Sequence, residues 1–225
     1  KDYETCQFTH LQKHDLNLVL QKRYALLNWQ QGSGKTAAAY HRAKYLLKFR
    51  KVRNVVILAP AIAINMTWDA FLKTNKERYR VIRTSKDLED VPEGIFLIVS
   101  TSMLGKLKRS LARFIKLRSR KLCLIFDESD EITNPNSQRT KYVLCLFRRL
   151  KYKLLDTGTT TRNNISELYS QFELLYNNSV NMICRCDRIY RENKEREIES
   201  ESNPYYGEPF PAFRGHVLFK ACHCP

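Results

Sequence analysis

The chain has 225 residues, 43% of them hydrophobic, which is enough to bury one substantial core and is close to the usual upper size of a single domain. Lys and Arg outnumber Asp and Glu by 39 to 23, and the net charge of +16 favours a polyanionic partner such as nucleic acid over a merely soluble basic surface. The longest apolar run, residues 55–64, is too short to cross a bilayer, no signal peptide is visible, and an odd total of 7 cysteines fits an intracellular, reducing compartment (cytoplasm or nucleus) better than a disulfide framework.

Short apolar runs rich in β-branched residues alternate along the chain with segments of helical periodicity. The expected strands are residues 24–29, 54–60, 94–100, 121–127 and 152–158, and the expected helices between them include residues 36–49, 61–72 and 104–117. In the last of these helices one face carries Leu104, Leu107, Leu111, Phe114 and Ile115. The alternation predicts an α/β fold with an open, mostly parallel sheet and helices on both faces, which binds its ligands beyond the carboxyl ends of the strands.

The regular pattern ends near Tyr176. Residues 191–202 form a charge run typical of an exposed helix, and residues 203–213 contain three prolines and a glycine, typical of a loop or linker. The tail cysteines occur two residues apart, which is not the usual spacing of a zinc site, so we expect ordinary reduced thiols. We therefore expect one domain over residues 1–175 and a less regular C-terminal extension, a linker or an insertion, over residues 176–225.

The stretch "QQGSGKT" joins the first expected strand to the helix that follows it. Gly32 and Gly34 would let the backbone around Ser33 curl, so that its N–H groups point at an anion near the positive end of the helix. In such a phosphate loop Lys35 reaches the β and γ phosphates of ATP, and the Thr36 hydroxyl ligates Mg²⁺. The alternative reading is a chance turn before a helix.

An acidic pair follows the strand "KLCLIF", at the edge of the sheet where a magnesium nucleotide would lie. Asp127 would hold the metal ion through water, and Glu128 would orient and deprotonate the attacking water. A solvated acidic turn is the alternative. The presence of the phosphate loop in the same chain favours the nucleotide site.

With both elements in place, the sequence resembles superfamily 2 helicases and translocases, and within them the Swi/Snf-type DNA translocases. Residues 58–71 are similar to that family's motif Ia, residues 127–141 to its acidic box with an Asn-Pro-Asn-Ser turn, and residues 154–175 to its motif III. The sequence departs from the family pattern at Trp29, Asp130, Thr160 and Arg162.

The resemblance implies a P-loop NTPase fold: the first of two RecA-like lobes, with ATP and Mg²⁺ bound between them. The second lobe of the same protein would supply an arginine finger, so the isolated lobe would hydrolyse ATP very slowly or not at all. The partner would be DNA, in duplex form and bound without sequence preference. Further site residues that the resemblance implies are Gln12 at the adenine edge, Ser100 and Thr101 at the DNA backbone, and Thr157, Gly158 and Thr159 in coupling ATP to DNA.

Some readings stay open at this point. Gln12 could be a surface residue of a helix, and the basic residues between 106 and 121 could form a solvated helix face rather than a phosphate-contacting stripe. Among functions, the rivals to a duplex-DNA translocase are a strand-separating helicase, a restriction-system motor, and a non-catalytic nucleic-acid-binding module with a vestigial phosphate loop.

Overall fold

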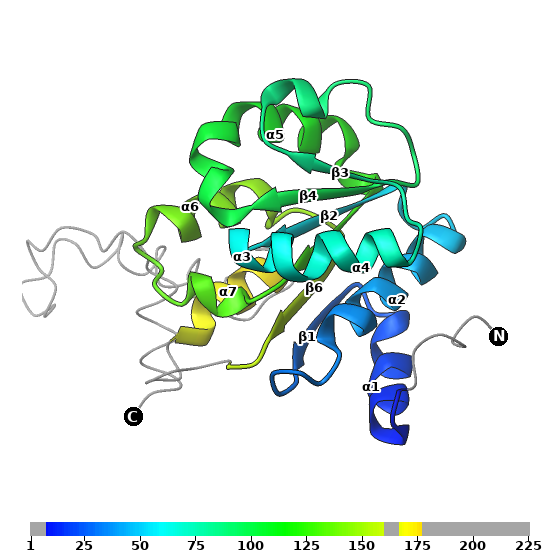
Figure 1. Ribbon diagram of the computed structural model, residues 1–225. Helices are drawn as coiled ribbons and strands as arrows, with labels where there is room; N and C mark the ends of the chain where they lie inside the picture. Colours follow the sequence, from blue (N-terminus) through cyan, green and yellow to red (C-terminus); the bar gives the residue numbers. More distant parts are fainter. Residues whose placement is uncertain (1–7, 160–166, 177–225) are drawn as a thin grey trace, which may run out of the picture.

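The computed structural model describes residues 8–159 and 167–176, and its centre is a parallel β-sheet (Figure 1). The strand order is β1-β6-β5-β2-β4-β3. The strands are β1 (Tyr24–Asn28), β2 (Asn54–Ala59), β3 (Tyr79–Ile82), β4 (Phe96–Ser100), β5 (Leu122–Phe126) and β6 (Tyr152–Thr157). Because all the described strand pairs are parallel, their carboxyl ends lie along one edge of the sheet.

Helices cover both faces of the sheet (Figure 1). They are α1 (His10–Leu20), α2 (Lys35–Lys48), α3 (Ala61–Ala63), α4 (Asp69–Thr74), α5 (Leu104–Arg118), α6 (Gln138–Phe147) and α7 (Leu168–Leu175). Buried side chains of α1, α2 and α4 pack on one face, and those of α5, α6 and α7 pack on the other. In the described part of the chain, no helix is both long enough and apolar enough to cross a membrane.

The expected α/β architecture is confirmed, and each expected strand is present within a few residues of its expected bounds. The apolar face expected for residues 104–117 is buried in α5. Strand β3 was not expected from the sequence. It is a short edge strand of mostly half-buried residues, and its sequence "YRVI" includes an arginine, so it lacks the continuous apolar run of an inner parallel strand.

The helix expected at residues 61–72 is interrupted. Ile64–Trp68 form a π-helical turn between α3 and α4, with the helical direction continuing through all three parts. Such turns are rare and widen the helix locally, which changes the direction in which the following side chains point. The residue that ends this turn, Trp68, contacts the candidate site described below.

Apart from Tyr176, the expected C-terminal extension, including the charge run and the tail cysteines, lies outside the described residues. The same holds for residues 160–166 of the stretch similar to motif III.

Candidate functional site

The loop between β1 and α2 has the backbone conformation that a phosphate loop requires. Gly32 and Gly34 have φ angles of +78° and +81°, in the left-handed region that glycine adopts without strain. No atom lies within 4 Å of the position that a β-carbon would occupy at either glycine, so the space beside the loop is open there. Gly34 is the N-cap of α2, and the free N–H groups of the first helical turn are available to an anion.

Two further residues of the loop stand at the start of α2. The Lys35 side chain is buried, 8% exposed, and its Nζ donates a hydrogen bond of 3.3 Å to the carbonyl oxygen of Trp29. Its ammonium group is therefore held over the loop, while Thr36 beside it is half-buried. Trp29 replaces a glycine of the general phosphate-loop pattern. Its contact with Lys35 is made by its backbone carbonyl, which any residue type can provide.

The acidic pair lies at the end of β5, at the same edge of the sheet. Asp127 is buried, 6% exposed, and its N–H extends the sheet by donating to the carbonyl oxygen of Leu58 at 2.9 Å. Glu128 has a φ of +54°, a strained conformation for a residue with a side chain. Burial raises the pKa of the Glu128 carboxyl, Asp127 raises it further, and Lys35 acts in the opposite direction. A carboxylate with a raised pKa is a stronger base than an exposed one.

The structure adds a carboxyl group that the sequence analysis missed. Asp156, near the end of β6, is fully buried, and neither of its oxygens accepts a hydrogen bond from a donor in the described residues. Burial and the adjacent Asp127 carboxyl raise the pKa of Asp156 well above its usual range. The signal in the sequence was an acidic residue ending an apolar strand, just as Asp127 does.

Part of the motif III stretch packs directly on the phosphate loop. A β-carbon at Gly158 would lie 3.3 Å from the Nζ of Lys35, so only glycine leaves the ammonium group undisturbed. Thr157 is buried, and its hydroxyl accepts a hydrogen bond from the N–H of Thr159 at 3.0 Å. The Thr157 hydroxyl also lies 3.4 Å from an oxygen of Asp130 in the acidic box. These contacts bring residues 157–159 next to both nucleotide motifs.

Gln12 is also brought to the loop. Its side-chain Nε2 donates to the carbonyl oxygen of Ser33 at 2.7 Å, and its Oε1 accepts from the N–H of Thr9 at 2.7 Å as part of a capping box for α1. The fully buried Arg42 of α2 fixes the other end of α1 by donating to the carbonyl oxygens of Val19, Lys22 and Arg23. Gln12 is therefore a half-buried residue in contact with the phosphate loop, not a free surface side chain.

A separate cavity of about 440 Å³ opens at the carboxyl ends of β3 and β4. We call it the strand-edge cavity. Its lining includes Ser100, the start of the π-turn segment, and two cations: Lys106, the first of the basic residues noted between 106 and 121, and Arg83, which the sequence analysis did not single out. Thr101 was expected beside Ser100 at this surface, but it is 5% exposed and is not part of the lining. The cavity offers hydroxyl groups and positive charge, which suit a phosphate backbone.

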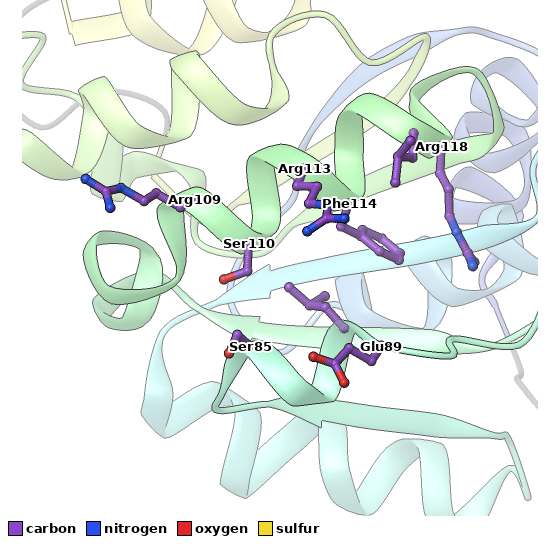
Figure 2. A pocket seen from close by; sticks show the side chains of 9 residues that line it. Ser85, Glu89, Arg109, Ser110, Arg113, Phe114 and Arg118 are labelled. Carbon is purple, nitrogen blue, oxygen red and sulfur yellow. The ribbon is translucent and has the colours of Figure 1, made fainter.

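A larger, open hollow of about 610 Å³ lies between α5 and the short helical turn at Ser85–Leu88 (Figure 2). Arg109, Arg113 and Phe114 of α5 line one side, and Ser85 and Glu89 line the other (Figure 2). Several of its residues belong to the C-terminal half of α5, which runs back from the carboxyl edge of the sheet. The hollow is therefore distinct from the nucleotide motifs and from the strand-edge cavity.

The oxygen donors at the nucleotide motifs fit Mg²⁺. The described residues contain no group of three or more His, Cys, Asp or Glu side chains arranged to hold a metal ion by themselves. Magnesium in nucleotide sites needs only one or two protein oxygens, since phosphates and water complete its shell. The Thr36 hydroxyl and the Asp127 carboxyl provide such oxygens, and the Asp156 carboxyl is buried beside Asp127.

Comparisons with known proteins agree with this geometry. The family model described as type III restriction enzyme, res subunit, matches residues 5–162. The solved SWI2/SNF2 ATPase core of Sulfolobus solfataricus, in complex with double-stranded DNA, is similar in structure, with a TM-score of 0.66 and 18% sequence identity over 96% of this chain. This chain spans 42% of that protein chain. A comparison with curated proteins gave no match.

The structural likeness shows the RecA-like fold, and together with the family match it confirms the resemblance to superfamily 2 helicases and translocases. Because the family model covers more than half of the sequence, this chain belongs to the family of the type III restriction enzyme res subunit and is a helicase-type ATPase domain.

Proposed function

We propose that the chain is the ATP-binding first lobe of a DNA-dependent ATPase that translocates along duplex DNA. The observation that carries the proposal is the convergence of a buried lysine, an open glycine loop and an acidic pair at one edge of a parallel sheet. The loop and the lysine lie between β1 and the start of α2, whereas the acidic pair follows β5, far away in the sequence. The family match and the fold support the same conclusion.

In this proposal each group of the nucleotide site has a distinct role. Lys35 and the loop N–H groups bind the phosphates, and Gln12 binds the adenine edge. Thr36 and Asp127 hold Mg²⁺, which supplies charge neutralisation at the phosphates when it is bound. Glu128 accepts a proton from the attacking water, for which its raised pKa suits it.

Ser100 and the cations of the strand-edge cavity bind the DNA backbone, since hydroxyl groups and positive charges contact phosphates without reading the base sequence. Residues 157–159 lie against Lys35 and near the acidic box, and we propose that they couple the nucleotide state to the DNA track. The domain division at residue 175, with a linker or insertion beyond it, is part of this proposal.

In this proposal, the cation opposite Lys35 is an arginine finger from the second lobe. In related phosphate-loop enzymes an arginine finger changes the rate by about 10³- to 10⁵-fold. We therefore propose that residues 1–225 bind ATP but hydrolyse it far more slowly than the full-length protein does with DNA. Turnover measurements on both proteins, with Glu128→Gln as the blank, test this. Equal rates would contradict the proposal that the chain is half of a motor.

A second candidate is a restriction-system motor built on the same lobe, which the family match favours. Both candidates move on duplex DNA, so a strand-displacement assay separates them from a strand-separating helicase but not from each other. Double-strand cleavage that accompanies ATP-driven movement of the full-length protein would identify the restriction-type motor.

The test of the nucleotide site is calorimetry with a non-hydrolysable ATP analogue. Lys35→Ala should abolish measurable binding while the chain stays folded. Lys44→Ala is the matched control, because it removes a lysine from the same helix whose side chain is 46% exposed and pairs with Glu77 at 2.6 Å. Unchanged affinity in Lys35→Ala would rule out the site, and with it the motor.

A further inference from the structure

The π-turn between α3 and α4 ends at a tryptophan that reaches the nucleotide motifs. Trp68 is fully buried in the core on the α2 face of the sheet. On the other side of the same helical segment, Ile62 and Met66 are 73% and 77% exposed. The segment therefore has one face in solvent and directs a large aromatic ring inward at its end. Wide turns of this type frequently occur at functional sites.

Trp68 contacts the proposed magnesium carboxylate. Its indole N–H donates a hydrogen bond of 2.7 Å to Oδ2 of Asp127, and both residues are buried. The Asp127 main chain is fixed separately by its bond to Leu58. The backbone and Oδ2 of Asp127 are both held, which fixes the direction of the carboxylate. An indole is neutral and is only a donor, so it orients the carboxylate without competing for a cation.

This hydrogen bond also restricts rotation of the Asp127 carboxylate relative to the neighbouring Asp156. Asp127 lies beside the buried Asp156 carboxyl, and two adjacent carboxyl groups repel each other when both are ionised. A donor on Oδ2 keeps the Asp127 carboxylate turned in one direction. Side chains that orient metal-binding groups in this way change metal affinity by about 10- to 100-fold when they are removed.

We propose that Trp68 is a positioning residue for Asp127. By orienting this carboxylate, Trp68 sets the magnesium dependence of nucleotide binding. The proposal deepens the proposed function and rests on it. Trp68 touches neither substrate nor metal in this scheme, and it acts only through the orientation of the Asp127 carboxylate.

The test compares nucleotide affinity in Mg²⁺ and in EDTA, using a non-hydrolysable ATP analogue and calorimetry. Trp68→Phe keeps an aromatic ring in the core but removes the N–H. We expect affinity in EDTA to be unchanged, and the gain in affinity on adding Mg²⁺ to fall by about tenfold or more. In an Asp127→Asn background the same substitution should have no further effect, because its action passes through that carboxylate.

Tyr79→Phe is the matched control. The Tyr79 hydroxyl donates to the carboxylate of Asp69, at the start of α4, so this variant also removes an aromatic donor from an aspartate on the same helical segment. It should leave the magnesium dependence unchanged. An equal loss in both variants, or a normal magnesium gain in folded Trp68→Phe, would overturn the proposal.

A second measurement keeps Trp68 in place, in case Trp68→Phe does not fold. The chain has 2 tryptophans, so Trp29→Phe leaves Trp68 as the only tryptophan emitter. Its fluorescence should respond to the analogue with Mg²⁺ and not to the analogue in EDTA, and equal responses would count against the proposal. If the unsubstituted chain binds no nucleotide under either condition, the proposed function itself fails.

Discussion

Gly158 lies against the ammonium group of Lys35, so closely that a β-carbon at this position would be 3.3 Å from Nζ. It would also be 3.7 Å from the N–H nitrogen of Gln31 and 3.9 Å from the carbonyl oxygen of Trp29, in the phosphate loop. The described glycines with a positive φ are Gly32, Gly34 and Gly94. Gly158 is not one of them, so a glycine is needed at this position for space and not for backbone conformation. The chain just after β6 therefore limits the positions that the Lys35 ammonium group can occupy.

Adding side-chain volume at Gly158 should weaken nucleotide binding. Gly158→Ala should cost a few-fold in affinity for an ATP analogue, because the end of a lysine can shift by a few tenths of an ångström. Gly158→Val should cost roughly tenfold or more, equivalent to about 1.4 kcal/mol. Gly105→Ala is the control, since its β-carbon would also lie 3.3 Å from a neighbour, the Tyr142 ring, away from the site. Equal affinities in the Gly158 series would contradict the contact.

Gln12 allows a test of adenine recognition. Gln12→Glu keeps the acceptor for the Thr9 N–H, and therefore the capping box, but loses the amide donor that faces Ser33. If the amide reads the base, the unsubstituted chain should bind ATP more tightly than GTP, and the variant should lose about threefold to tenfold of that preference. Competition binding with both nucleotides measures the ratio. A ratio that does not change would show that Gln12 only braces the loop.

The stability of the domain should depend on pH through a buried lysine on β6. Lys153 is 1% exposed and donates to the carbonyl oxygens of Arg148 and Leu174, near the ends of α6 and α7. Burial lowers the pKa of Lys153 from 10.5 to about 8, Arg148 lowers it further, and Glu173 opposes. Above pH 8 the folded protein has released a proton that the unfolded chain still holds, so raising the pH toward 10.5 favours the folded state.

The prediction is a difference between two proteins, because other groups also titrate in this range. Relative to Lys153→Met, the free energy of unfolding of the unsubstituted chain should rise between about pH 8 and 10.5, with a slope of at most about 1.4 kcal/mol per pH unit. Denaturant unfolding at several pH values gives both curves. Parallel curves would mean that Lys153 has the same pKa in the folded and unfolded chains.

DNA binding should depend steeply on salt and should not depend on base sequence. The slope of log affinity against log salt falls by about 0.9 for each phosphate contact that is lost from a duplex. Removing both cations of the strand-edge cavity, Arg83→Ala with Lys106→Ala, should lower the slope by up to about 1.8. Lys116→Ala, an exposed lysine near the far end of α5, should change the slope less than either cavity cation does. A strong preference for one DNA sequence would contradict backbone recognition.

The amino-acid sequence by itself determined the parallel sheet and the positions of both nucleotide motifs. Each of these features is local in the chain. An apolar β-branched run forms a buried strand. The glycines before Lys35 adopt the left-handed backbone conformation of a tight loop directly before a helix. Because parallel strands end at one edge, the order of strands and motifs was enough to bring Lys35 and Glu128 together.

The features that only the tertiary structure decided depend on pairs of residues far apart in the sequence. Nothing near Thr101 indicates that its side chain is buried while Ser100 lines a cavity, and nothing near Asp156 indicates that its carboxyl lies beside Asp127. The π-turn is equally hidden, since residues 61–72 carry an ordinary helical pattern. Periodicity fixes which face of an element is apolar, but the packing of one element against another fixes which atoms meet, and the hydrogen bond from Trp68 to Asp127 is set by that packing.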